Sequence, residues 1–385
     1  MKRLCVLGIS GSIGVNVSDV VLSHREDFEI VGASVNVKIA VLEEMIALHP
    51  SIRFVSIGDL SCAETFQKAH PDIAVFFGEA GLTELIDATP YDMVVNALVG
   101  FAGLVPTVHT LEKGIDCALA NKESLVVGGS LIHEILRNGK AHLYPIDSEH
   151  VALAKLLNAH DLKDVSSLYI TASGGAFRDL SREELRDVTL AQALRHPSWS
   201  MGAKITVDSA TMMNKGFEII EAYHLFHFPL EKIHVLMHDE SVIHSAIELK
   251  DHSIAADLGP ADMRIPITYA LYGESYAETG RVAHLHLEDL GSLHFRPFDP
   301  KRYPAVELAK EALRIGGSMP CVLNAANEEA NLAFREGRLP FIKIEEIVGF
   351  AMKQHKLVMN PSLNDLIRID SWARKTASNR IEKGA

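Results

Sequence analysis

The sequence predicts an α/β protein with an N-terminal Rossmann-like domain, a central α+β domain and a C-terminal helical bundle. Short β-rich runs alternate with helical runs up to about residue 146, the order of elements then loosens, and nearly everything beyond Pro300 is helical. At 385 residues the chain also exceeds the roughly 250 residues at which single cores stop growing, so several domains are expected. The predicted domains are 1–146, 147–290 and 291–385.

The first domain is expected to contain a doubly wound parallel sheet. Helical stretches at 13–24 and 41–48 have the length of right-handed βαβ connections. The strands are predicted in the apolar runs LCVLGI, FEIVGAS, RFVSI, IAVFF, MVVNALV and CALA.

The later elements follow one another less regularly. The pattern predicts a helix near 150–157, a strand in SLYITAS and a helix over 182–194, followed by a loop, another helix and several strands. The C-terminal helices are expected to end at glycine or proline and to begin at capping residues such as Ser362, three positions before Asp365.

Composition and charge exclude several classes of protein. With 50 acidic against 37 basic side chains the formal charge is −13, which disfavours broad binding to nucleic acids or to anionic membranes. The apolar start of the chain is broken by Gly8 and predicts a buried strand rather than a signal peptide, and the most apolar window, Met93–Pro106, is too short to cross a bilayer. The four cysteines form no CxxC pair, which fits reduced thiols. We therefore expect a cytoplasmic protein whose partners are small molecules.

The first predicted strand leads into a glycine-rich turn, GISGSIG at residues 8–14, and then into a helix. In that position the absent side chains let backbone N–H groups meet a pyrophosphate, which favours a dinucleotide site over the alternative of a simple tight turn. After the second strand, SVNVK at residues 34–38 offers an amide and a cation but no carboxylate, which favours NADP over NAD.

Two carboxylates, Asp147 and Glu149, follow the apolar run AHLYPI. Extended backbone would send both to the same side, where they could share a Mg²⁺ or Mn²⁺ ion, with Glu218 as the candidate third ligand. The alternative is that Asp147 and Glu149 only cap the next helix, and the local sequence leaves both interpretations open.

The loop 195–204 places His196 and Trp199 between helix breakers and is predicted to be a mobile lid over a small ligand. The alternative is that Trp199 is simply a core residue.

Hydroxyl, amide and ammonium groups gather in the segment DSATMMNKGFE, where a helix would put Asn214, Lys215 and Glu218 on one face. Such donors beside a carboxylate suit a phosphate and a metal held together, whereas the alternative is a solvated Lys–Glu pair. A second hydroxyl–glycine cluster at 171–175 could bind the same anion. The two histidines of 284–286 are not interpreted as a zinc site, because no third ligand lies nearby in the sequence.

Together these motifs resemble one enzyme family. The set GISGSIG, ALANKESLVVGG, PIDSEH, TASGGAF, HPSWSMGAKITVDSATMMNKGFE, SVIHSAI and LNAANE closely resembles the 1-deoxy-D-xylulose 5-phosphate reductoisomerases, the NADPH- and metal-dependent enzymes of the methylerythritol phosphate route to isoprenoids. The resemblance runs in order from Leu4 to about Phe334. It implies a homodimer that rearranges the substrate by retro-aldol and aldol steps and then reduces the branched aldehyde with hydride to 2-C-methyl-D-erythritol 4-phosphate.

Carried over position by position, the resemblance assigns residues to each ligand. The implied ligands of Mg²⁺ or Mn²⁺ are Asp147, Glu149 and Glu218, and the hydroxyl and carbonyl end of the substrate would contact Lys122 and Ser148. The substrate phosphate is assigned to Ser173, Ser209, Asn214 and Lys215, with His196 beside it. The lid is assigned Trp199 and Met201, and the implied cofactor contacts are Ser10, Gly11, Ser12, Ile13, Asn121, Glu123 and Gly202.

At one element the chain departs from the family, which usually carries Gly-x-Asn after the second strand for the adenosine phosphate. This chain has Asn-Val-Lys there, so Asn36 and Lys38 are the candidate contacts and the strictness of NADPH over NADH stays open. Two other functions also stay open: a simple dehydrogenase of a phosphorylated sugar, and a non-catalytic dinucleotide sensor.

Overall fold

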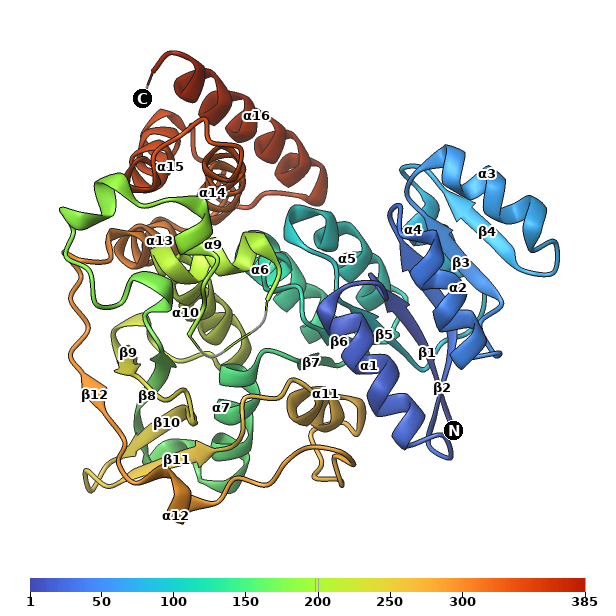
Figure 1. Ribbon diagram of the computed structural model, residues 1–385, viewed down its shortest axis with the longest axis horizontal. Helices are drawn as coiled ribbons and strands as arrows, with labels where there is room; N and C mark the ends of the chain where they lie inside the picture. The colour runs from blue at the N-terminus through green and yellow to red at the C-terminus, as the bar shows by residue number, and fades with distance from the viewer. Residues whose placement is uncertain (198, 200, 385) are drawn as a thin grey trace. The chain divides into compact units, whose positions relative to one another are not determined.

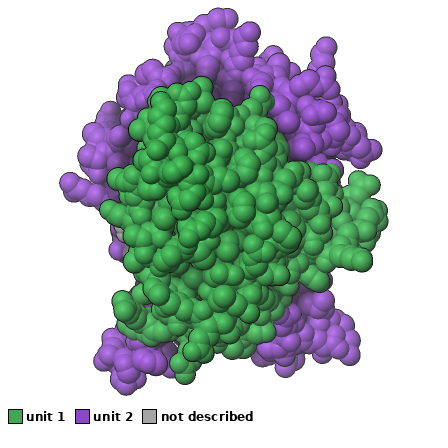
Figure 2. Space-filling model, turned by 90° about the vertical axis from the view of Figure 1, so that its right-hand side faces the viewer, with its two compact units in different colours: residues 1–121, 132–151, 262–283 green, residues 122–131, 152–261, 284–385 purple. Residues whose placement is uncertain are grey.

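The computed structural model describes residues 1–197, 199 and 201–384. They form two compact units, coloured separately in Figure 2, and each unit is assembled from three segments of the chain. The first unit comprises 1–121, 132–151 and 262–283, and the second comprises 122–131, 152–261 and 284–385.

The first unit contains a parallel sheet with the strand order β4-β3-β2-β1-β5-β6-β7 (Figure 1). The order reverses next to β1, which confirms the predicted doubly wound, Rossmann-like fold. Every strand expected from the apolar runs is present, and β7 extends the sheet within the run AHLYPI. The strands are β1 Lys2–Leu7, β2 Phe28–Val35, β3 Phe54–Ile57, β4 Ala74–Phe77, β5 Met93–Asn96, β6 Asp116–Leu119 and β7 Leu143–Pro145.

Helices cover both faces of this sheet because alternate residues of each strand point to opposite sides. Leu4 and Val6 pack in a core with residues of α1, α2, α3 and α11, whereas Cys5 and Leu7 pack on the other face with residues of α4. The helices with residues in this unit are α1 Ser12–Ser23, α2 Ile39–Leu48, α3 Leu60–Ala69, α4 Gly81–Asp87, α5 Leu104–Glu112, α6 Lys122–Asn138, α7 Ser148–Ala159 and α11 Arg264–Leu271.

The second unit combines a mixed sheet with a group of packed helices. The sheet has the order β11-β10-β8-β9-β12, in which β8 and β9 are parallel and the other pairs antiparallel. Its strands are β8 Val165–Ala172, β9 Ile233–His238, β10 Ile243–Leu249, β11 Ile254–Leu258 and β12 Phe295–Arg296. Its own helices are α8 Leu190–Ala193, α9 Ala203–Thr211, α10 Met213–Phe226, α12 Leu287–Leu290, α13 Pro304–Ile315, α14 Met319–Arg335, α15 Ile344–Gln354 and α16 Leu363–Glu382.

The continuous helix predicted over 182–194 is wrong. The chain makes a short 3₁₀ turn at Glu184–Asp187, becomes extended at Val188, and starts the separate helix α8 at Thr189. The Thr189 side chain accepts the N–H of Gln192, and the Gln192 side chain accepts the N–H of Thr189. This capping box starts a new helix where the apolar spacing alone suggested continuity.

The helical tail is confirmed. α14 lies against α15 and α16 (Figure 1), and the apolar residues of these helices share a core with those of α9, α10 and α13. The predicted start of the last helix is also correct, because Ser362 caps α16 and exchanges hydrogen bonds with Asp365. Among the described residues, no helix is both long and apolar enough to cross a bilayer.

Replacing the cap tests how far the last helix depends on it. We expect Ser362→Ala to lower the free energy of unfolding by about 1 kcal/mol, because the N–H of Asp365 loses its acceptor. For a unit of this size that corresponds to a drop of about 2–4 °C in Tm, measurable by calorimetry. Thr376→Ala on the same helix removes only a hydroxyl bonded to the carbonyl of Trp372 and should leave Tm within a degree. Equal losses in the two variants would contradict the role of the cap.

Candidate active site

The glycine-rich turn of the first unit is shaped by contacts that leave no room for side chains. Gly8 has φ +81°, and a Cβ on Gly14 would lie 2.4 Å from the Cα of Ile9. Ser34 of β2 fixes the turn, since its hydroxyl accepts the N–H of Gly8 at 2.9 Å and its carbonyl accepts the N–H of Ile9 at 3.0 Å. The turn therefore brings bare backbone to the start of α1.

The residues expected to contact a cofactor lie around this turn. Gly11 is the N-cap of α1, and the first turn of α1, Ser12 to Val15, all of it described, holds no acidic residue. Ser10 and Ile13 are half-buried, whereas Gly11 and Ser12 are exposed. A helix N-terminus without a carboxylate nearby favours an anionic ligand.

Asn36 and Lys38 follow β2 at the same edge of the sheet and are both exposed. Asn36 packs against the turn after β3: a Cβ on Gly58 would lie 2.3 Å from Asn36 Oδ1, and the Asn36 carbonyl accepts the N–H of Asp59 at 3.1 Å. This fit places the amide of Asn36 beside backbone and leaves Lys38 as the cation of the element.

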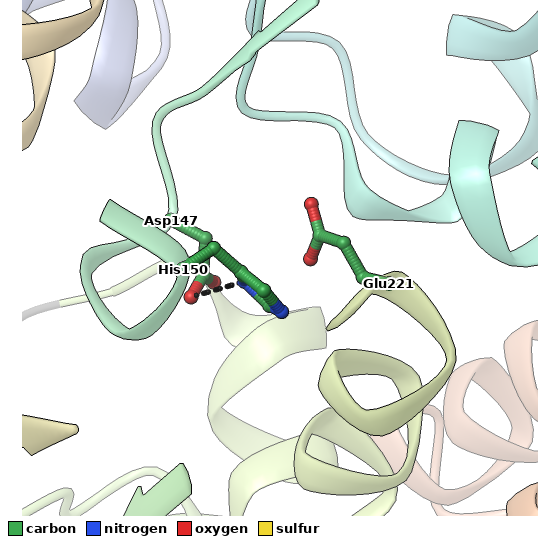
Figure 3. A group of neighbouring side chains, drawn as sticks. All are labelled: Asp147, His150 and Glu221. Atoms are coloured by element: carbon green, nitrogen blue, oxygen red, sulfur yellow. Dashed lines mark hydrogen bonds and ion pairs between the residues drawn. The ribbon is translucent and has the colours of Figure 1, made fainter. Parts of the chain in front are cut away.

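Asp147 and Glu149 do not stand on extended backbone as the sequence analysis assumed. Strand β7 ends at Pro145 and α7 begins at Ser148, so Glu149 lies in the first helical turn. Asp147 Oδ1 accepts the N–H of Glu149 at 3.2 Å, which is a capping contact, and it also pairs with His150 Nδ1 at 3.0 Å (Figure 3). Ser148 Oγ donates to Glu149 Oε2. The first unit thus holds two carboxylates, a hydroxyl and an imidazole on consecutive residues.

In the second unit Glu218 is the centre of a buried cluster on α10. Its Oε1 accepts Lys122 Nζ at 2.9 Å and the amide of Asn214, and its Oε2 pairs with Lys215 Nζ. The side chains of Lys122, Lys215 and Glu218 are 7%, 5% and 1% exposed, respectively. The predicted helical face is confirmed, and the alternative of a solvated Lys–Glu pair is wrong because water is excluded from it. Figure 3 also labels Glu221, one turn further along α10.

A second cluster in the same unit joins three residues assigned to the substrate phosphate. His196 Nε2 lies 3.3 Å from Ser173 Oγ and 3.1 Å from Ser209 Oγ. The backbone N–H of Trp199 donates to His196 Nδ1 at 3.0 Å, so Nδ1 is the acceptor and a neutral ring carries its proton on Nε2. The cluster therefore presents one imidazole N–H and two hydroxyls, all able to donate to an anion.

The predicted lid lies partly outside the described residues, since it includes Ser198 and Ser200. Trp199 and Met201 are half-buried, and the Trp199 ring is 6.3 Å from that of His244. Gly202 is the N-cap of α9. Because Trp199 is only half-buried, it is neither a fully buried core residue nor a fully exposed one.

Asn121 and Glu123, the other two expected cofactor contacts, are both buried. The amide of Asn121 donates to the carbonyls of Leu98 and Gly100 at 2.9 Å each and so supports the loop after β5. Glu123 pairs with Lys204 of α9. Both side chains thus make contacts within the protein that could not be predicted from the motif ANKES.

A polar network around Lys204 was not predicted from the sequence. It joins α6, α9 and α14 through the side chains of Glu123, Lys204, Asp208, Asn327 and Asn331. The available signals were the four-residue spacings of Lys204 to Asp208 and of Asn327 to Asn331, each of which places two polar side chains on one helical face.

Comparison with known proteins decides the family. Three family models match in sequence order: 1-deoxy-D-xylulose 5-phosphate reductoisomerase over residues 4–129, its C-terminal domain over 143–226, and the DXP reductoisomerase C-terminal domain over 258–376. The chain belongs to the 1-deoxy-D-xylulose 5-phosphate reductoisomerase family. The resemblance drawn from the motifs is thereby confirmed.

Relatives match over nearly the whole chain. The 1-deoxy-D-xylulose 5-phosphate reductoisomerase of Geobacillus kaustophilus is 46% identical over 97% of this chain and 98% of its own. A solved structure of the Zymomonas mobilis enzyme in complex with NADPH is 36% identical and superimposes with a TM-score of 0.91, covering 99% of both chains. Another reductoisomerase structure, in complex with NADPH, fosmidomycin and magnesium, is 33% identical with a TM-score of 0.91 over 99% of this chain and 98% of its own.

Two substitutions of His196 separate its contacts. In His196→Gln the side-chain amide can still donate from about the Nε2 position, whereas in His196→Asn it can accept only the Trp199 N–H. We expect His196→Asn to weaken binding of inorganic phosphate about tenfold, the equivalent of one lost hydrogen bond to a charged group, and His196→Gln to weaken it less than threefold. Titration followed by ³¹P NMR measures both. Equal loss in the two variants would show that the donor at Nε2 does not contact the anion.

Proposed function

We propose that this chain converts 1-deoxy-D-xylulose 5-phosphate to 2-C-methyl-D-erythritol 4-phosphate, using NADPH and a divalent metal ion. The observation that carries the proposal is the buried Glu218 cluster in the same unit as the donors of Ser173, His196 and Ser209. A member of this family needs a carboxylate for a cation and donors for a phosphate, and the described residues supply both. The names and bound ligands of the relatives support the same reaction.

The residues that would hold the metal are Asp147, Glu149 and Glu218. Their donor set fits the ion, because carboxylate oxygens are the ligands that Mg²⁺ and Mn²⁺ prefer. When bound, the ion would act as a Lewis acid on the ketone and the adjacent hydroxyl of the substrate.

Lys122 and Ser148 would orient the reacting end of the substrate. An ammonium group has three N–H donors, so Lys122 can hold Glu218 and donate to a substrate oxygen at once. Ser148 donates to Glu149, and that contact fixes the direction of its hydroxyl oxygen. Both groups are thus oriented by carboxylates before the substrate arrives, which lowers the entropy lost on binding.

The phosphate of the substrate would bind far from the reacting carbons, at Ser173, Ser209, Asn214 and Lys215 with His196 beside them. The N–H of Trp199 donates to His196, so the ring that meets the phosphate is tied to the proposed lid. Binding energy from the phosphate can therefore close the lid and exclude water from the reaction.

NADPH would bind at the turn of residues 8–14, and its nicotinamide would supply hydride to the aldehyde. The turn fits a pyrophosphate, because its glycines bring bare backbone to the N-terminus of α1, where a Cβ on Gly14 would collide with the backbone of Gly8 and Ile9, and the first helical turn has no competing carboxylate. Asn36 and Lys38 would meet the adenosine phosphate, and Asn121, Glu123 and Gly202 would lie at the nicotinamide end.

We further propose that the protein works as a cytoplasmic homodimer with no nucleic-acid or membrane partner. The cysteines support a reducing compartment, since all four are free thiols and Cys5, Cys117 and Cys321 are buried. Sedimentation of the purified chain measures its oligomeric state.

The reaction and the metal site are tested together with Glu149→Gln. We expect this variant to lose at least about a thousandfold in metal-dependent oxidation of NADPH with the xylulose phosphate, because a neutral amide is a poor ligand for Mg²⁺. Binding of NADPH should stay within twofold. Glu134→Gln, at an exposed position on α6, is the matched control and should keep full activity.

The product distinguishes this reaction from simpler ones. Product NMR should show the branched skeleton of the methylerythritol phosphate. An unbranched product would indicate a simple sugar-phosphate dehydrogenase, and no turnover with either Mg²⁺ or Mn²⁺ would indicate a dinucleotide sensor. Full turnover of Glu149→Gln would contradict the metal assignment.

The cofactor preference is tested at Lys38. Lys38→Gln should raise the KM for NADPH about tenfold and leave the KM for NADH unchanged, because one charged donor to the additional phosphate is lost. Lys68→Gln, an exposed lysine of α3 in the same unit, should change neither value. A parallel change in both KM values would place Lys38 away from that phosphate.

A further inference from the structure

The ammonium group of Lys204 lies at a junction of three helices in the second unit. It pairs with Glu123 in the first turn of α6 and with Asp208, one turn further along α9, at 3.0 Å. It also lies 5.3 Å from the centre of the Phe217 ring on α10. The side chains of Lys204, Glu123 and Asp208 are 13%, 8% and 2% exposed, respectively.

Asp208 is held from the other side by α14. Its Oδ1 accepts the amides of Asn327 at 2.9 Å and Asn331 at 2.8 Å, while its Oδ2 faces Lys204. The amide of Asn331 also donates to the backbone carbonyl of Lys204 at 2.9 Å. α9 is thereby fixed to α14 through the side chain of Asp208 and the backbone carbonyl of Lys204.

The charges of this network depend on one another. Burial by itself raises the pKa of the Glu123 carboxyl, but the Lys204 ammonium and its hydrogen bond outweigh burial and lower that pKa below its usual range. Burial likewise lowers the pKa of Lys204, yet Asp208, Glu123 and Glu328 together raise it above its usual range. The Lys204 ammonium thus lowers the pKa of the Glu123 carboxyl and is itself stabilised by the carboxylates around it.

We propose that Lys204 is a positioning residue that fixes the two proposed binding elements relative to each other. Asp208 directly precedes Ser209 of the phosphate cluster, and Glu123 directly follows Lys122, which contacts Glu218. The α9 helix also begins immediately after Gly202, at the end of the proposed lid. Lys204 thus joins the start of α6, with the cofactor contact Glu123, to the helix that carries the phosphate donor Ser209.

This inference takes the identity of the ligands from the proposed function. The contacts of Lys204 are observed in the structure and do not depend on that function. Each arm of Lys204 reaches a different binding element, so removing one arm should affect one ligand. A merely structural ion network would instead weaken the binding of every ligand in proportion to the loss of stability.

The test uses three variants of the full chain and two probes, NADPH and inorganic phosphate. Glu123→Gln should weaken NADPH about tenfold and phosphate less than twofold, whereas Asp208→Asn should weaken phosphate about tenfold and NADPH less than twofold. Lys204→Met should weaken both about tenfold. Fluorescence titration measures NADPH, ³¹P NMR measures phosphate, and calorimetry reports Tm.

Lys310→Met is the matched control. Lys310 also pairs with a carboxylate of its own helix, Glu307 at 3.4 Å, and lies 6.0 Å from the ring of Phe298, and neither of these partners belongs to a proposed binding element. We expect this variant to bind both probes as the wild type does.

Three outcomes would overturn the inference. Lys204→Met could bind both probes within twofold of the wild type, or the two single-arm variants could weaken both probes equally, which remains measurable if Lys204→Met does not fold. If the wild type binds neither NADPH nor phosphate, the proposed function fails together with this inference. If the wild type turns over the xylulose phosphate and only the selectivity of the arms is missing, the positioning role alone is wrong.

Discussion

The fold of the second unit requires that its buried carboxylates be neutralised by cations packed directly against them. Removing a carboxylate from water costs several kcal/mol unless a cation or several hydrogen bonds replace the water. Each buried acid of the two clusters described above is met by a lysine. The pairs are Glu218 with Lys122 and Lys215, and Glu123 and Asp208 with Lys204. These lysines lie at or near the starts of α6, α9 and α10, and Asn214, another proposed substrate contact, lies beside Lys215 at the start of α10.

The two clusters carry opposite net charge, and the difference has a chemical consequence. Two lysines around Glu218 leave a net positive charge, whereas two acids around Lys204 leave a net negative one. Buried ion pairs are seldom the most stable way to fill a core, so their presence is poorly explained by stability alone. The positive cluster has the sign that a phosphate requires, in a protein whose formal charge is −13.

Much of this molecule could be predicted from its sequence, and the exceptions share a cause. Strands and crossover helices follow local periodicity, and the site residues stand in motifs whose residue types state their chemistry. The helix over 182–194 failed because the cap at Thr189 outweighed apolar spacing, and the extended Asp147–Glu149 pair failed because α7 starts between them. The Lys204 network was missed because the four-residue spacings are local to α9 and to α14, whereas Glu123 lies 81 positions from Lys204 and Asn327 lies 119 positions from Asp208.

The choice of lysine over arginine at these buried positions agrees with a working site. An arginine would bind a carboxylate through two parallel N–H groups and hold it in one geometry, whereas an ammonium is a compact charge on a flexible stem with three rotatable donors. Lys122 must serve Glu218 and, in the proposed reaction, a substrate oxygen, so it needs to keep one contact while it makes another. Lys204 pairs with Glu123 and Asp208 on different helices through a single compact charge. The same property that lets lysine bridge several oxygens makes it suited both to positioning and to binding.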